Sequence, residues 1–167
     1  NSITQWKWNL DNGAGTVTAN TNAVQTNTYT TWGTKNVYLN TVSNTGCVSD
    51  TFRLPGGFKA NPLPVVGFIL PEVCLNDATA TFTDTSSIAD GTEAGFSYLW
   101  KFDDGVSTVD PTKRPVPLTA STSVKSIAAS YKTFGNYTVS LQVTSSNGCI
   151  ATDNKSFTVN GSDAFKF

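Results

Sequence analysis

The chain has 167 residues, 14% of them charged, and a formal net charge of −1. This balance excludes a basic nucleic-acid-binding surface, and the absence of histidine excludes Ser-His-Asp and Cys-His nucleophiles. No apolar run approaches the roughly 20 residues that cross a bilayer. Abundant β-branched and aromatic residues beside polar turn formers predict an all-β protein of one or two domains. Because the chain also lacks histidine, we expect no enzyme activity.

The first predicted strand lies in "WKWNLDNG", residues 6–13. Trp6, Trp8 and Leu10 alternate with polar residues, which is typical of a half-buried strand. The dipeptide Asn12-Gly13 then favours a tight turn. An aromatic sugar-binding platform of Trp6, Trp8 and Trp32 is one interpretation, and core packing of these side chains is the other.

A second strand is expected where Val37 and Leu39 alternate, after "TYTTWG" at 28–33 and before Cys47. The stretch "NPLP" at 61–64 then has the composition of a short linker. We therefore expect a boundary between two units at this point.

The second half of the chain repeats these signals in the same order. Residues 98–105 ("YLWKFDDG") match 6–13, and residues 134–149 match 32–47 without a gap. Six of those sixteen positions are identical: Gly33/Gly135, Val37/Val139, Leu39/Leu141, Ser43/Ser145, Gly46/Gly148 and Cys47/Cys149. Such internal self-similarity indicates a tandem repeat.

The second copy has two strand-like stretches before its tryptophan strand, and the first copy has none. We therefore expect residues 1–61 to be a repeat that lacks its first strands and residues 62–160 to be a complete repeat. Residues 161–167, "GSDAFKF", resemble a linker and the first strand of a following repeat.

Trp-x-Phe-x-Asp-Gly, Tyr-x-x-Phe-Gly, Tyr-x-Val-x-Leu-x-Val and Gly-Cys follow one another in residues 100–149. This order resembles the PKD (polycystic-kidney-disease) domain, in particular the Cys-containing repeats of Bacteroidetes surface proteins. The resemblance implies tandem immunoglobulin-like β-sandwiches of about seven strands each. Two departures stand out: Asp103 replaces the first glycine of the usual "FGDG", and Lys35 stands where the second copy has Tyr137.

In such a sandwich we expect a core signature of six residues, namely Trp8, Trp100, Tyr29, Tyr131, Gly33 and Gly135. Cys74 on an early strand and Cys149 on a late strand are expected to form a disulfide against which Trp100 packs. Cys47 corresponds to Cys149, and we expect it to have no partner in this segment.

Two groups of charged residues are candidates for ligand contact. Asp103, Asp104 and Asp110, with Asp90 and Glu93 on a nearby loop, offer oxygen ligands for Ca²⁺, or they are turn formers and solvated charges. Lys113 and Arg114 lie in the long loop 106–125, where contact with a partner is expected. No other cofactor is expected.

The expected function is structural: an extracellular or cell-surface repeat segment of an adhesin, stalk or filament, whose partners are neighbouring repeats or like subunits. One alternative is an accessory module of a secreted hydrolase that contacts surface polysaccharide or protein. The other is a filament subunit whose strand 163–167 completes the first unit of a neighbour.

Overall fold

The computed structural model describes residues 2–74, 79–102 and 115–161, and its regular structure is almost entirely β. Within these residues there is no α-helix, and the one helical segment is the 3₁₀ turn η1 (Glu93–Gly95). No helix in this part of the chain is long and apolar enough to cross a lipid bilayer. The predicted all-β class is confirmed. The chain divides into two compact units, Asn1–Pro62 and Leu63–Phe167.

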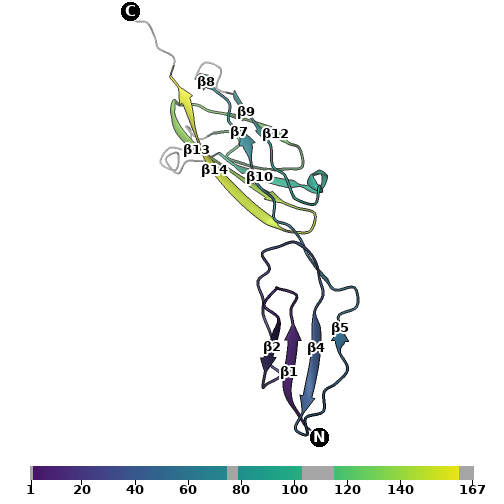
Figure 1. Cartoon of the computed structure of the whole chain (residues 1–167). Helices are drawn as coiled ribbons and strands as arrows, with labels where there is room; N and C mark the ends of the chain where they lie inside the picture. The colour runs from purple at the N-terminus through teal and green to yellow at the C-terminus, as the bar shows by residue number, and fades with distance from the viewer. Residues whose placement is uncertain (1, 75–78, 103–114, 162–167) are drawn as a thin grey trace, which may run out of the picture. The chain divides into compact units, whose positions relative to one another are not determined.

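The first unit is built on a four-stranded antiparallel sheet with the order β2-β1-β4-β5 (Figure 1). In its two longest strands Trp8 lies opposite Leu39, and on the other side of β1 it lies opposite Val17. A separate ribbon pairs β3 with β6. The strands of this unit are β1 (Ile3–Asn9), β2 (Thr16–Ala19), β3 (Gly33–Lys35), β4 (Tyr38–Ser43), β5 (Phe52–Arg53) and β6 (Phe58–Ala60).

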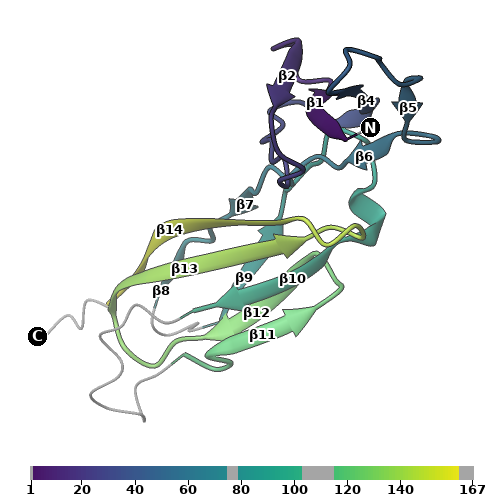
Figure 2. The same cartoon turned by 90° about the horizontal axis from the view of Figure 1, so that it is seen from below.

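The second unit contains two sheets, with the orders β11-β10-β13-β14-β8 and β12-β9-β7. Its longest feature is the β13–β14 hairpin (Figure 2). All pairings are antiparallel except that of β8 with β14. The strands are β7 (Phe68–Ile69), β8 (Val73–Cys74), β9 (Thr79–Asp84), β10 (Ser97–Lys101), β11 (Thr119–Thr122), β12 (Ser126–Ser130), β13 (Gly135–Thr144) and β14 (Ile150–Asn160).

The core of the second unit is an aromatic cluster formed by both sheets. Phe82 of β9 has no exposed surface, and neither does Trp100 of β10. The Phe68 ring meets Trp100 edge to face with 5.3 Å between ring centroids. Each aromatic ring removes a large apolar area from water, so this cluster holds the two sheets together.

Each unit contains a sheet of the same design, and the strands of the two sheets correspond one to one. Trp100 lies opposite Leu141 and Ala120, as Trp8 lies opposite Leu39 and Val17 in the first unit. The order β2-β1-β4-β5 thus corresponds to β11-β10-β13-β14. Within residues 2–62 no strand corresponds to β7, β8 or β9.

The turn that follows the shared hairpin strand is the same in both units. The Ser145 hydroxyl accepts the amide N–H of Cys149 at 3.1 Å, and the Ser43 hydroxyl accepts that of Cys47 at 3.1 Å. In each turn the serine N–H also donates to the cysteine carbonyl at 2.9 Å. Gly148 has φ 77°, in the left-handed region that glycine enters at little cost. The repeated "S-x-x-G-C" is therefore a turn signature.

The predicted disulfide between Cys74 and Cys149 is wrong for this structure, in which all three cysteines are free. Cys74 lies opposite Asn160 at one end of β14, whereas Cys149 precedes the other end. At about 3.3 Å per residue, the 11 residues of β14 separate them by roughly 35 Å. A disulfide needs Cα atoms within about 7 Å. Trp100 therefore packs against aromatic rings and not against a bridge.

A buried carboxylate–phenol pair adds an electrostatic element to the second unit. Asp84 is buried, and its carboxylate accepts the Ser86 N–H at 3.0 Å. Burial and the nearby Asp84 carboxylate raise the pKa of Tyr98 to about 12. The neutral phenol is therefore favoured in the folded state, because its anion would be desolvated beside a negative charge.

We expect Ser145→Ala to lower the free energy of unfolding of the second unit by about 1 kcal/mol, since the N–H of the half-buried Cys149 loses its hydroxyl acceptor. Ser146→Ala is the matched control, because Ser146 is exposed and its loss should stay below about 0.5 kcal/mol. Urea denaturation followed by circular dichroism measures both. Equal losses in the two variants would contradict this role of the turn.

The raised pKa of Tyr98 predicts an alkaline limit to stability. Its contribution is present below the ordinary pKa of 10.0 and is lost as the pH rises toward about 12. Tyr98→Phe should therefore flatten the decline of unfolding free energy in this window, and Asp84→Asn should reduce it in part. Denaturant titrations at half-unit pH steps measure the slope. An unchanged slope in Tyr98→Phe would show that other groups set this limit.

Candidate binding cleft on the first unit

The charged candidates fall into two groups in the structure. Asp103, Asp104, Asp110, Lys113 and Arg114 all lie outside the described residues, so calcium binding and loop contact remain predictions. In the part that is described, no group of three His, Cys, Asp or Glu residues gathers in metal-binding geometry.

The remaining acidic pair stabilises its own loop. The Glu93 carboxylate accepts the Ile88 N–H at 3.1 Å, and this hydrogen bond lowers the pKa of Glu93. Asp90 accepts the Thr92 hydroxyl at 2.7 Å. Asp90 and Glu93, expected as calcium ligands or as solvated charges, therefore form hydrogen bonds within their own loop.

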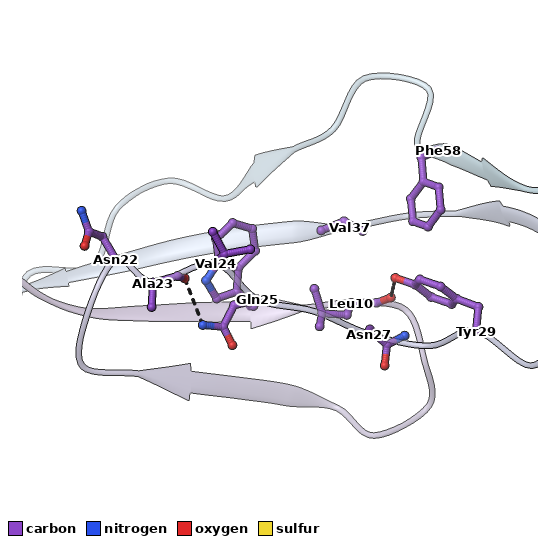
Figure 3. Close-up of a pocket in the computed structure, with 10 residues that line it drawn as sticks. Leu10, Asn22, Ala23, Val24, Gln25, Asn27, Tyr29, Val37 and Phe58 are labelled. Atoms are coloured by element: carbon purple, nitrogen blue, oxygen red, sulfur yellow. Dashed lines mark hydrogen bonds between the residues drawn. The ribbon is translucent and has the colours of Figure 1, made fainter.

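The first unit carries a cleft with a cavity volume of about 530 Å³ (Figure 3). Its lining combines apolar side chains with the coil segment that precedes Tyr29. The residues are Trp8, Leu10, Asn22, Ala23, Val24, Gln25, Asn27, Tyr29, Val37 and Phe58. Sequence reasoning did not predict this cleft, although the predicted loss of the first strands implied exposed core.

Two contacts fix the floor of the cleft. The Tyr29 hydroxyl donates to the Leu10 carbonyl (Figure 3), and the Tyr29 ring meets Phe58 edge to face at 5.2 Å. Trp8 is half-buried, and its indole Nε1 is buried without a hydrogen-bond partner. The signature residues Trp8 and Tyr29 thus line an open site, whereas Trp100 and Tyr131 are fully buried.

Lys35 occupies the position in the first unit that Tyr137 occupies in the second, and it keeps the corresponding contacts with a threonine and a tyrosine. The Lys35 ammonium donates to the Thr31 hydroxyl at 2.9 Å and lies 5.4 Å from the Tyr29 ring centroid. In the second unit Tyr137 shares a hydrogen bond with Thr133, the counterpart of Thr31, and its ring lies 4.6 Å from Tyr131. A cation–π contact therefore stands in for an aromatic pair.

For Trp32 the core-packing interpretation is wrong, because Trp32 is 51% exposed and its counterpart Phe134 is 70% exposed. Both precede a glycine with positive φ, 117° at Gly33 and 146° at Gly135. The chain turns away at these glycines, which leaves the preceding ring on the surface. Trp6, by contrast, is half-buried within the sheet.

Solved structures similar to this chain include two bacterial PKD domains. The PKD1 domain of Vibrio anguillarum Epp is 27% identical, with a TM-score of 0.45 over 61% of this chain and 99% of that one. The PKD1 domain of the Vibrio cholerae metalloprotease PrtV is 28% identical, with a TM-score of 0.43 over 59% and 98%. The fibronectin(III)-like modules of Clostridium thermocellum CbhA are 16% identical, with a TM-score of 0.44 over 99% and 82%.

A comparison with curated protein sequences gives no match. The family model of the PKD domain matches residues 61–160, more than half of the chain and nearly all of the second unit. Because this model covers the two-sheet core of the second unit, the chain belongs to the PKD-domain family.

Proposed function

We propose that the chain is a non-catalytic, extracellular structural repeat segment of a cell-surface adhesin, stalk or filament. PKD domains are in general non-catalytic modules that occur in extracellular proteins. The observation that carries the proposal is the recurrence of one sheet, in one register, in two consecutive units. Repetition of a scaffold adds length and surface, and it needs no active site.

The linker between the two units supports a role in which the repeats form a stiff, extended spacer. Asn61-Pro62-Leu63-Pro64 places two prolines where the units meet in sequence. Proline fixes its own φ and restricts the residue before it, so such a linker resists bending more than a glycine-rich one. Neighbouring repeats or like subunits are the partners that this role requires.

An accessory contact role is the second candidate function. It is favoured by Trp32, which presents 51% of its surface to solvent in a chain of low charge. Exposed aromatic rings bind sugar faces or apolar protein patches through their large, rigid surfaces. In this role the module carries a secreted hydrolase to its polysaccharide.

Small-angle X-ray scattering tests the structural role. We expect an elongated profile for the chain and a broader distance distribution for the double variant Pro62→Gly/Pro64→Gly, because the linker gains backbone freedom. Pro55→Gly is the matched control, since Pro55 is exposed within the first unit. A compact profile for the unmodified chain would count against a role in reach.

Sedimentation with insoluble polysaccharides tests the contact role. If Trp32 contacts sugar, Trp32→Ala should lower the association constant, fitted to the bound fraction over a polysaccharide concentration series, by about tenfold, an effect of about 1.4 kcal/mol that one stacked ring can supply. Phe134→Ala provides the comparison in the second unit. If the unmodified chain stays in the supernatant with every polysaccharide tested, the proposed polysaccharide-contact role is wrong.

A further inference from the structure

The starting observation is the position of Phe82 in the second unit. Its ring centroid lies 6.1 Å from Trp100, 5.2 Å from Phe102, 6.5 Å from Tyr131 and 5.4 Å from Phe157. Phe82 thus fills a socket made by four aromatic side chains and has no exposed surface.

The same socket recurs in the first unit. Trp8 and Leu10 correspond to Trp100 and Phe102 through the matched strands. Tyr29 corresponds to Tyr131 through the gapless repeat. Phe58 corresponds to Phe157, because Phe58 lies opposite Lys35 as Phe157 lies opposite Tyr137.

All four counterparts line the cleft of about 530 Å³. The pair Tyr29–Phe58 meets edge to face at 5.2 Å, and its counterpart Tyr131–Phe157 is tilted at a similar distance, 5.1 Å. Phe58 is 37% exposed, whereas Phe157 is 3% exposed. The four side chains of the socket are therefore in place, but the socket is open to solvent. Within residues 2–62 no strand corresponds to β9, which carries Phe82.

An unpaired backbone segment borders this socket. In the second unit β12 pairs with β9, with Ile127 opposite Phe82. Its counterpart, residues 24–28, belongs to no strand, although half-buried Gln25, Asn27 and Tyr29 alternate with exposed residues as in a strand. Val24 at its start is 89% exposed. Such an edge offers backbone hydrogen bonds to an incoming strand.

We propose that the first unit binds an extended polypeptide strand with the chemistry of β9. This strand pairs antiparallel with residues 24–28 and places one aromatic side chain, opposite Gln25, into the cavity between Trp8, Leu10, Tyr29 and Phe58. Backbone pairing supplies affinity and the aromatic pocket supplies specificity, as in other strand additions. This goes beyond the proposed function, since reach and rigidity require no acceptor site.

The chemistry of the cleft favours a protein strand over a glycan. The floor is formed by aromatic and aliphatic side chains, and the Tyr29 hydroxyl already donates to the Leu10 carbonyl. The Gln25 amide donates to the Ala23 carbonyl at 3.1 Å (Figure 3). Sugars need several convergent polar groups, whereas a phenyl ring needs only apolar surface.

The register predicts which backbone groups of the segment face the incoming strand. In the second unit the Lys125 carbonyl accepts the Asp84 N–H at 2.7 Å, while Ser130 exchanges both of its bonds with Val116 on the other side. Residues 125, 127 and 129 therefore face β9, because directions alternate along an antiparallel strand. Their counterparts 23, 25 and 27 face the proposed strand, and Thr26 faces away from it.

The test uses the full chain and the peptide TATFTDTS, which is residues 79–86 of its own sequence. Isothermal titration calorimetry should give one site, and the indole N–H resonance of Trp8, assigned with Trp8→Phe, should shift on titration. The matched peptide TATATDTS, which carries Phe82→Ala, should bind on the order of tenfold more weakly or worse, because it leaves the socket empty.

Two proline variants of the chain test the edge. Gln25→Pro removes an N–H that faces the incoming strand and should abolish peptide binding. Thr26→Pro is the matched control, because the N–H that it removes faces away, and it should retain binding. Unchanged resonances of Trp6 and of the β1–β4 residues in both variants show that the first unit remains folded.

Several results would overturn the proposal. These are equal affinities for the two peptides, unchanged binding by Gln25→Pro, or a shift of the Trp100 indole resonance in place of that of Trp8. A chain that dimerises through this face and excludes the peptide would assign the cleft to a second copy. Preferential saturation by a soluble oligosaccharide would assign it to a glycan.

Discussion

The structure depends on the burial of one face of the sheet that recurs in both units, β2-β1-β4-β5 in the first and β11-β10-β13-β14 in the second. In the second unit Phe82 and Phe68 arrive from the opposite sheet and cover Trp100 and its neighbours completely. The strand that carries Phe82 also pairs with β12, and its last residue, Asp84, is buried near Tyr98. In the first unit no described strand supplies a counterpart of Phe82, and the residues that correspond to its neighbours, such as Trp8, line a cleft.

Much of the fold could be predicted from local pattern. Trp8 and Leu10, like Val139 and Leu141, are apolar residues spaced two apart with a polar residue between them. This spacing predicts the strands, because successive side chains of a strand point to opposite faces. The repeated Ser-x-x-Gly-Cys predicts two equal segments, and the structure shows that they are equal turns. These features depend on residues close in sequence, or on strands that pair in the shared hairpin.

Two of the three failures, the disulfide and the cleft, concern features that depend on residues distant in sequence. Cys74 and Cys149 were paired by analogy with facing strands, but β8 joins the sheet of β14 at its far end. The burial of Trp32 was inferred from its correspondence with Phe134, whereas both rings are exposed and each precedes a glycine with positive φ. The cleft depends on four side chains from separate segments, of which Phe58 gave no sequence signal of its own.

The serine–cysteine turn has a practical consequence for this chain. It places a sulfur atom at the same structural position of each unit, Cys47 in the first and Cys149 in the second. With Cys74 replaced, fluorophores or spin labels attached to these two thiols would occupy matched points, and the distance between them would report how consecutive units are oriented. Each repeat thus supplies an equivalent labelling site for spectroscopy in solution.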